Sequence, residues 1–384
     1  MLINKVKASI FLIIFSGFFS SLIGGYKLGP FNIHFYLVFI NLLIFFIFFC
    51  HVNNFKKIIL ILPFFFLIFL NLFMSNGMYG YLQTIYILSP LVLFLIGTSI
   101  NFESYFENYF KKCLSVAVRL IFLSYIIHEL TGLTQISTRW ASVYVAIIVI
   151  LNLILNKNKK DVIFSILSLI FLFASGSRGV SVALLFSILF TYILFNFKKR
   201  YSFIVMGFTI FLFFYGYEWI LKNLFKMDFL RERTFYDGIY DIDKIKNLEF
   251  NSSGRDIAWP IYWDEINNTT NIISIVFGRG SGAIHDFGIQ NLGESWAHPH
   301  NEVIRIVFDY GVYGLLIFLI FWIYVLIMIL RSCLDIYLKK IAFACSVFLF
   351  IIMLTDNPLL YPLYFGNIVL FLMGYLYSKS VSRV

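Results

Sequence analysis

The sequence has 384 residues, of which 60% are hydrophobic and only 13% are charged, and its formal net charge is +10. So few polar residues cannot cover a water-soluble globule of this length, which excludes a soluble protein and indicates an integral membrane protein. Apolar runs recur along nearly the whole chain, so a cleaved signal peptide followed by a soluble domain is excluded too.

About twelve of these runs are long enough to cross a bilayer as helices, which takes roughly 17 to 25 residues each. The twelve predicted spans cover roughly residues 8–25, 33–51, 56–73, 79–100, 113–129, 140–155, 161–175, 180–197, 201–221, 311–330, 338–354 and 360–378. The sequence therefore predicts an all-α integral membrane protein with one large extracytoplasmic loop that contains short helices.

Basic residues fall in every second loop and near both termini, as in the pairs Lys56/Lys57 and Lys111/Lys112. Because Lys and Arg are retained on the cytoplasmic side of a membrane, this alternation predicts that both termini are cytoplasmic. It also accounts for the excess of positive charge. No soluble segment shows the basic patch with interleaved aromatic residues that binds nucleic acid, so we expect no nucleic-acid partner.

The chain divides into three parts. Residues 1–221 would hold transmembrane helices 1–9, residues 222–301 the large outer loop, and residues 302–384 an interfacial helix and transmembrane helices 10–12. A loop of roughly 80 residues is usually functional or disordered, and its aromatic residues argue against simple disorder. Within it, SSGRDIAWPIYWDEI predicts a capped helix start, and FGRGSG predicts a flexible turn.

The turn SGSRG, residues 175–179, joins two predicted spans on the outer side. Its glycines let the backbone reverse sharply, which places Arg178 at the membrane surface. A guanidinium stays charged and its planar donor fork matches phosphate oxygens, so Arg178 is a candidate for binding a lipid-linked phosphate. The alternative is an arginine that only snorkels from a helix end to the interface.

The stretch AHPHNEVIRIVFDYGVYGLL, residues 297–316, is unusually polar for this chain. Its proline predicts that a helix begins within HPH, because proline is tolerated in the first turn. Glu302, Arg305 and Asp309 then share one side of the helix, and apolar residues share another. This pattern predicts an interfacial helix at the outer surface that ends at the glycines of DYGVYG.

His300 would stand at the positively polarised start of that helix, where anions bind readily. Near neutral pH an imidazole can donate a proton, accept one or contact an oxyanion. A zinc site is an alternative reading of the HxH pair, but no third His or Cys is suitably placed in the sequence, and we predict no metal.

Three segments together resemble a known family. In order and spacing, they resemble the O-antigen ligase and O-antigen polymerase family of bacterial membrane glycosyltransferases. The segments are SGSRG before a span, SGRDIAW followed by VFGRGSG in the long outer loop, and HPHNEVIRIVFDYGVYGLL before the next span. The resemblance covers about residues 160–330, and the first spans match only as hydrophobic segments.

The resemblance implies a twelve-span, GT-C-like fold in the bacterial inner membrane. Its periplasmic face would transfer a glycan from an undecaprenyl-pyrophosphate-linked donor without a metal or other cofactor. Matched position by position, Arg178 and Arg255 would be catalytic and would clamp the pyrophosphate. His300 would assist, either by activating the acceptor hydroxyl or by contacting the leaving phosphate.

Further substrate-binding candidates are Arg279, His298, Asn301, Trp259 and Trp263. The tryptophans could stack on sugar faces, although a loop core or the interfacial aromatic belt also explains them. Arg279 interrupts a Gly-rich turn where the family often carries an apolar or small residue, so this position departs from the family pattern.

Polymerase and ligase share the donor and differ in the acceptor. We favour an O-antigen polymerase that joins lipid-linked repeat units; its partners would be the lipid-linked donor and acceptor, the bilayer and a polysaccharide chain-length regulator. The alternatives are an O-antigen ligase that transfers the glycan to lipid A-core and, from another class, a lipid-linked oligosaccharide flippase. A flippase would place its polar groups near the bilayer midplane, whereas the clusters here gather on one face.

Overall fold

The computed structural model describes residues 2–23, 26–48, 59–75, 77–99, 105–131, 138–155, 159–174, 178–197, 207, 255–293, 297–359, 361–364 and 366–381. Within these ranges the fold is almost entirely α-helical, as predicted. A short hairpin of β1 (Lys27–Leu28) and β2 (Phe31–Asn32) is the departure from the all-α class in the described chain.

Each predicted span that the structure describes falls mainly on a helix, although residues 361–364, at the start of the last predicted span, form a turn. The helices before the large loop are α1 (Leu2–Ile23), α2 (Ile33–Phe48), α4 (Leu62–Met74), α5 (Gly77–Ser99), α6 (Tyr105–Thr131), α7 (Thr138–Leu155), α8 (Lys159–Ala174) and α9 (Arg178–Asn196). The helices after it are α15 (Glu302–Arg331), α16 (Ile336–Met353) and α17 (Gly366–Val381). Apart from Gly207, the predicted span at residues 201–221 lies outside the described residues.

Several of these helices can cross a membrane by length and composition. In the described chain they are Val6–Ile23, Gly77–Ser99, Gly179–Asn196, Glu302–Arg331 and Ile336–Met353, and shorter apolar helices cover Ile33–Ile44, Leu62–Met74 and Ser142–Ile154. The chain is therefore a helical, multi-pass membrane protein.

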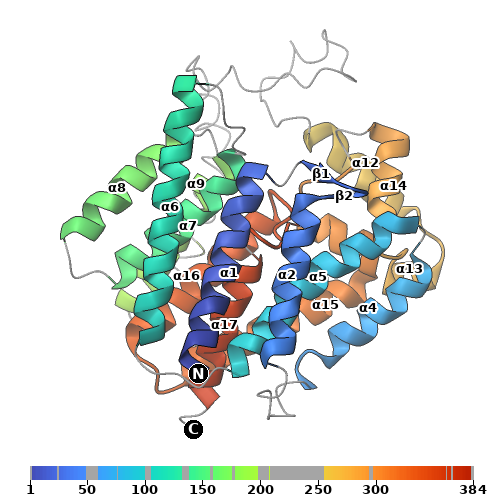
Figure 1. Cartoon of the computed structure of the whole chain (residues 1–384). Coiled ribbons are helices and arrows are strands. Elements are labelled where there is room, and N and C mark those ends of the chain that lie inside the picture. The colour runs from blue at the N-terminus through green and yellow to red at the C-terminus, as the bar shows by residue number, and fades with distance from the viewer. Residues whose placement is uncertain are drawn as a thin grey trace.

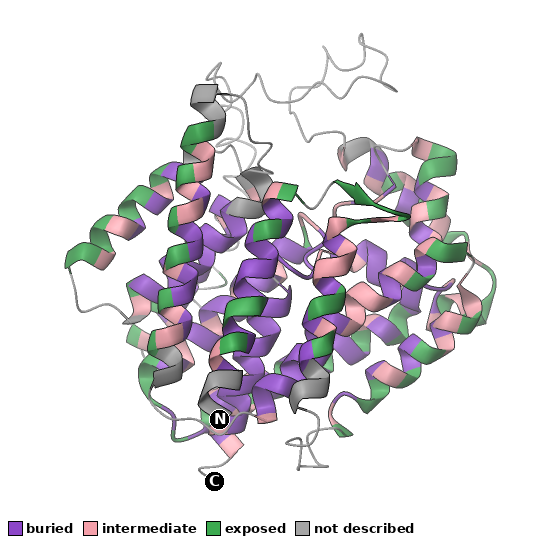
Figure 2. Cartoon of the chain, viewed as in Figure 1, coloured by how far each residue is buried: buried purple, intermediate pink, exposed green. Residues whose placement is uncertain are grey.

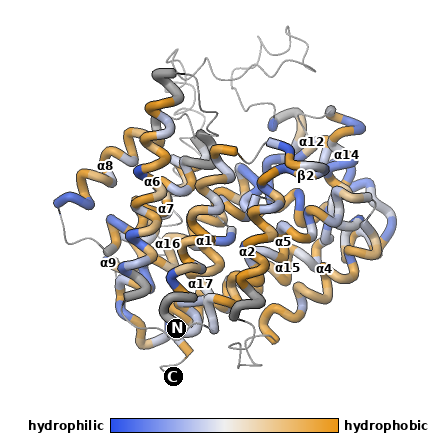
Figure 3. The backbone as a smooth tube through the Cα atoms, viewed as in Figure 1, coloured by the Kyte–Doolittle hydropathy of each residue, from blue (hydrophilic) through white to orange (hydrophobic). Residues whose placement is uncertain are grey.

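The outer helices carry apolar side chains on their exposed faces. On α4, Phe69 and Phe73 are 60% and 76% exposed, and on α8 Ile163 and Ile170 are 58% and 59% exposed. Figure 2 shows exposed positions along both helices, and Figure 3 shows the same helices as mainly hydrophobic. Such apolar surfaces are favourable in contact with lipid tails and unfavourable in contact with water.

The described part of the large loop folds as α12 (Arg255–Asn267), α13 (Ile272–Phe277) and α14 (Ala283–Leu292). These helices pack on the start of α15, at the end of the helical body opposite the N- and C-termini (Figure 1). The polar segments singled out from the sequence thus gather at one end of the bundle. Both chain ends lie at the other.

A kink divides α15. Gly311 has φ 68°, which is not helical, so the first part of α15, from Glu302, ends there, as the sequence predicts. The kink is also a point of close approach, because a Cβ at Gly311 would lie 2.3 Å from the carbonyl oxygen of Val276. The backbone of α13 therefore passes directly against the break in α15.

Helices α5 and α17 pack closely against each other in the core. A Cβ at Gly374 would lie 2.1 Å from the carbonyl oxygen of Phe94, and one at Gly97 would lie 2.3 Å from that of Phe371. Small residues let helices approach in this way inside a membrane, where packing rather than burial from water holds them together.

Replacing Gly374 by leucine should force α5 and α17 apart. Overpacking of this kind typically costs ~1–3 kcal/mol, so we expect Gly374→Leu to lower the melting temperature of the purified protein in detergent micelles. Ile320→Leu is the matched control, since Ile320 lies on α15 and is 66% exposed. Equal melting temperatures for the two variants would contradict the packing described.

Candidate functional site

Asn301 caps helix α15. Its side-chain oxygen accepts hydrogen bonds from the backbone N–H groups of Val303 (3.0 Å) and Ile304 (3.1 Å), and the helix begins at Glu302. The prediction that the helix begins within HPH was wrong, because asparagine is a strong N-cap and ends the non-helical segment after the proline. The Nδ2 of Asn301 also donates to the carbonyl of Leu354 (3.3 Å). One side chain thus joins the start of α15 to the connection between α16 and α17.

This junction places His300 beside an acid. His300 has a left-handed backbone, with φ 49°, and its Nδ1 lies 3.4 Å from Oδ1 of Asp356. A non-glycine residue in this conformation is uncommon and often marks a functional position. Asp356 Oδ1 also accepts the N–H of Asn357 (2.9 Å). The pairing gives the imidazole a fixed carboxylate neighbour.

Sequence reasoning missed Asp356. A signal was present, because the segment LTDNP places an acid directly after the apolar run of α16, and an ionisable group at a membrane helix is a functional candidate. Alternating topology also puts that end of α16 on the same side as HPHN. Combining these two observations would have paired His300 with Asp356.

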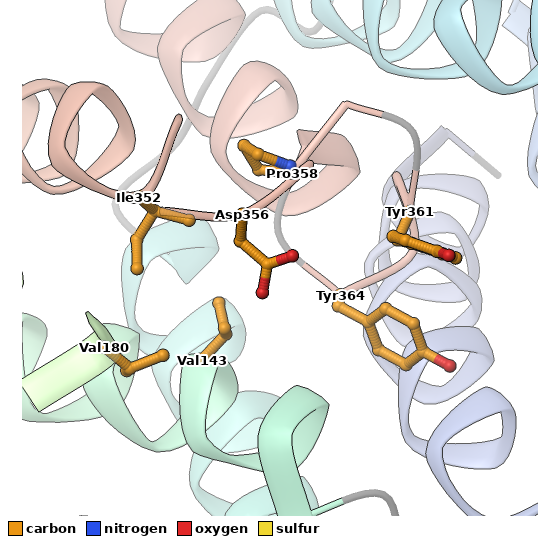
Figure 4. Close-up of a pocket in the computed structure, with 7 residues that line it drawn as sticks. All are labelled: Val143, Val180, Ile352, Asp356, Pro358, Tyr361 and Tyr364. Atoms are coloured by element: carbon orange, nitrogen blue, oxygen red, sulfur yellow. The ribbon is translucent and has the colours of Figure 1, made fainter. Parts of the chain in front are cut away.

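The SGSRG motif reaches the same junction. Helix α9 begins at Arg178, and a Cβ on the next residue, Gly179, would lie 2.9 Å from Oγ1 of Thr355. Val180, one residue further, lines a pocket together with Asp356 (Figure 4). The start of α9 therefore lies against the connection that carries Asp356. Residues 175–177 and the side chain of Arg178 lie outside what the structure describes.

The SGRDIAW motif contacts the HPHN stretch through helix α12. Helix α12 begins at Arg255, which is partly buried. One turn later the indole Nε1 of Trp259 donates to the carbonyl oxygen of Pro299 (2.7 Å). Trp259 thereby holds the backbone of HPH, while Trp263 on the same helix is 39% exposed. The starts of α9 and α12 and the HPHN stretch thus meet around Asp356.

The guanidinium of Arg279 joins α12 to α15. Its Nη1 binds the carboxylate of Glu265, and its Nη2 binds the carbonyl of Glu265 (3.0 Å) and the hydroxyl of Thr269. The group also lies over the ring of Phe308, 4.6 Å from its centroid. These contacts occupy the arginine with protein partners, so it holds the loop helices together.

The FGRGSG turn is packed, and the prediction of a flexible turn was wrong. Gly278, Gly280 and Gly282 are buried and have positive φ. The N–H groups of Arg279 and Gly280 donate to the carbonyls of Phe308 and Asp309 (3.1 Å each). Glycine is needed here because the backbones are in contact, and the turn is a rigid seat for the start of α15.

His298 lies in a half-buried aromatic cluster. Its Nε2 and the hydroxyl of Tyr79 are 2.7 Å apart, and the Tyr79 ring stacks on His285 with centroids 3.5 Å apart. Burial lowers the pKa of His298 well below 6.5, and the nearby His285, His300 and Arg305 lower it further. Asp356 opposes this effect only in part. His298 is therefore a neutral imidazole at physiological pH.

The charged side of the predicted interfacial helix is buried, which corrects the expectation of a helix lying on the outer surface. Glu302, Arg305 and Asp309 are each 0% exposed. Arg305 binds Glu302 through Nε (2.8 Å) and Nη2, and its Nη1 lies 3.7 Å from Asp309. Asp309 also accepts the N–H groups of Ile284 (2.9 Å) and Gly282 (3.3 Å) at the start of α14. The charges face one another instead of water.

Removing the central charge of this group, on Arg305, should destabilise the fold far more than removing all three charges. Breaking a buried ion pair from one side typically costs ~3–5 kcal/mol, because the remaining charge is left uncompensated. We expect Arg305→Met to lose its folded population in membranes. The triple variant Glu302→Gln/Arg305→Met/Asp309→Asn should recover much of it. Monodisperse yield after detergent extraction measures both, and an Arg305→Met yield equal to that of the unmodified chain would contradict this prediction.

Stability should fall in mild acid because of His298. The unfolded chain takes up a proton near pH 6.5, whereas the folded chain resists it. The stabilising effect is thus complete above pH 6.5 and decreases as the pH falls below that value. Melting temperatures in micelles between pH 8 and pH 5 test this. His298→Gln, which keeps a hydrogen-bonding group, should show a smaller decline; an equal decline would assign the effect to other groups.

No group of three or more His, Cys, Asp or Glu side chains in the described ranges is arranged to hold a metal ion.

Residues 163–319 match the family model described as O-Antigen ligase, which confirms the resemblance to the O-antigen ligase and polymerase family. The match begins in α8 and ends in α15, so it includes Arg178, Arg255 and His300 and stops before Asp356. A search of curated proteins gave no match.

Proposed function

Since residues 163–319 match the family model described as O-Antigen ligase, we propose that this chain is an O-antigen polymerase. It would join undecaprenyl-pyrophosphate-linked repeat units at the periplasmic face of the inner membrane, with both termini in the cytoplasm, a GT-C-like fold of twelve spans and no metal. The observation that carries the proposal is the meeting of three separate motifs at one end of the bundle, around the His300–Asp356 pair.

His300 acts as the base in this proposal. A carboxylate 3.4 Å from Nδ1 stabilises the imidazolium that forms when the ring takes a proton. The same carboxylate would repel a phosphate held against His300, which argues against a direct phosphate contact. Of the two roles that the sequence left open, the pairing with Asp356 favours activation of the acceptor hydroxyl.

The reaction is then a single displacement. The acceptor hydroxyl oxygen attacks the anomeric carbon of the donor glycan and passes its proton to His300. The bond between that carbon and the pyrophosphate oxygen breaks, and its electron pair leaves with the undecaprenyl pyrophosphate. Arg178 and Arg255 would stabilise the negative charge that develops on this leaving group.

The remaining sequence candidates support this machinery in different ways. Asn301 and Trp259 position the HPHN backbone through their contacts with Leu354 and Pro299. Trp263 presents an exposed ring for sugar stacking. Arg279 acts through the loop helices and does not bind substrate in this scheme.

Kinetics of single variants test the site. We expect Arg178→Ala, Arg255→Ala and His300→Ala each to lower the polymerisation rate by a factor of about 100 or more. The arginine variants should also raise the KM for the lipid-linked donor, whereas His300→Ala should lower kcat with little change in KM. The measurement uses protein in nanodiscs with lipid-linked repeat units extracted from cells that lack this chain.

Tyr192→Ala is the control, because Tyr192 lies on the same helix as Arg178 and is 60% exposed. If cells that carry each of the three variants made as much surface polysaccharide as wild type, the proposed site would be wrong. If His300→Ala raised the KM for the donor as much as the arginine variants do, His300 would contact the leaving phosphate and would not act as the base.

Deletion of the gene separates the candidate activities. A lipopolysaccharide core that carries one repeat unit indicates lost polymerisation, which is the result we expect. A core that carries none, with long chains left on the lipid carrier, indicates the ligase, the activity after which the matching family model is named. Repeat units retained on the cytoplasmic leaflet would indicate a flippase.

A further inference from the structure

Helix α13 exposes most of its apolar side chains. All of its six residues except Ser274 are apolar, and none of the six is buried. Ile272, Ile273 and Ile275 are 74%, 60% and 42% exposed, respectively. The stretch of chain around the helix, residues 266–278, carries no charged side chain. Single exposed apolar residues are common, but a contiguous group of them indicates a surface that contacts lipid or another protein.

The kink in α15 shows how deep α13 lies relative to the membrane. Between Gly311 and Arg331, residues 312–330 carry no charge, and as a helix they extend about 28 Å. This length matches the hydrocarbon core of a bilayer, which is roughly 30 Å thick, so Gly311 lies near the outer boundary of that core. A Cβ at Gly311 would lie 2.3 Å from the carbonyl oxygen of Val276 in α13. Helix α13 therefore lies at the boundary between the acyl chains and the headgroups.

Helix α13 adjoins two helices whose exposed sides are apolar. The Nδ2 of Asn71, near the end of α4, donates to the carbonyl oxygen of Phe277 (3.3 Å), and α13 lies beside α4 in Figure 1. The Phe277 ring in turn packs edge-on against Tyr313 of α15, with centroids 5.6 Å apart. Phe73 on α4 and Leu316 on α15 are both exposed. The lipid-facing surface of the bundle thus reaches α13, and a tyrosine at this level is typical of the interfacial aromatic belt.

We propose that α13 is inserted into the leaflet on the side of the outer loop, with Ile272, Ile273 and Ile275 among the acyl chains, and that it anchors this loop to the membrane. Insertion removes the apolar surface of the three isoleucines from water, which is the favourable term in the binding of interfacial helices. A helix of six residues is too short to cross a bilayer, so α13 stays within one leaflet. The inference is independent of the reaction that the chain catalyses.

The backbone of α13 is prepared for this environment. A segment in contact with acyl chains must satisfy its own backbone polar groups. At the start of the helix the side chain of Asn271 accepts the N–H of Ile273 (3.0 Å), and at its end the N–H of Gly278 donates to the carbonyl of Ser274 (2.9 Å). The uncharged polar residues 267–271 precede the helix and fit the headgroup layer.

A soluble partner protein fits this surface less well. The charged residues nearest to α13 in the sequence, Glu265 and Arg279, bind each other (2.5 Å), and Arg279 also binds Thr269. Interfaces between soluble proteins have a polar rim around their apolar core. Helix α13 instead borders on the lipid-facing sides of α4 and α15, at Phe73 and Leu316. A partner on α13 would therefore have to lie in the membrane itself.

Spin-label accessibility in nanodiscs tests the proposal. The label is attached to Ile273→Cys in a chain whose natural cysteines, Cys50, Cys113, Cys333 and Cys345, are replaced by alanine. An inserted label collides often with oxygen, which concentrates among the acyl chains, and rarely with a water-soluble nickel chelate. We expect the ratio of these two collision rates to match that at Phe73→Cys, the lipid control. It should clearly exceed the ratio at Asn291→Cys, the water control, because Asn291 is exposed on α14.

The other outcomes contradict the insertion of α13. A ratio as low as that at Asn291→Cys would place the helix in water. Low collision rates with both reagents would show that another segment or a second copy of the chain covers it. Ile272→Cys and Ile275→Cys should agree with Ile273→Cys.

A second measurement decides if the cysteine-free chain is not monodisperse. A photo-crosslinking benzophenone residue is then placed at position 273 of the otherwise unmodified chain in nanodiscs, and the mass of the product is measured after illumination. A lipid adduct supports insertion of α13. A protein adduct, or no adduct, overturns it.

Discussion

The side chain of Asn301 holds the candidate site together. Its oxygen caps α15 and its nitrogen reaches Leu354 in the connection after α16. Together with the indole of Trp259, which donates to the carbonyl of Pro299, this link holds the left-handed turn at His300 beside Asp356, although His300 and Asp356 come from distant parts of the chain. The amide of Asn301 thus sets where α15 begins and joins that point to the segment that carries Asp356.

The buried charges of α15 connect this helix to the helices of the outer loop. Asp309 accepts the N–H groups at the start of α14, and Arg305 holds Asp309 and Glu302 on one side of α15. Such a group is weak evidence for added stability, because removing three charges from water is costly. The contacts of the group link the start of α14 to one side of α15. Apolar packing acts beside these charges, since Ala258, Tyr262, Ile284, Ile304 and Phe308 form a buried cluster between α12, α14 and α15.

The sequence predicted the helices well because apolar runs of bilayer length leave the backbone little alternative to a helix. It also identified the segments that meet, since a tight Gly-rich turn and a helix start are local features. It missed Asp356 because the contact with His300 joins residues 56 positions apart, and it could not see the pairing of His298 with Tyr79 across 219 positions. The amphipathic pattern of α15 was misread for a different reason. A charged helix side looks the same in sequence whether it faces water or a buried ion network.

The contact between the FGRGSG turn and α15 limits which residues can stand at the turn and at the kink. The close approaches at Gly278, Gly280 and Gly311 are made by backbone against backbone, and each would be blocked by a Cβ. Any side chain at Gly278 or Gly311 would therefore push α13 away from the kink in α15. The helices of the outer loop and the first part of α15 would then separate as one step, since Asp309 accepts the N–H groups at the start of α14 from the same part of α15.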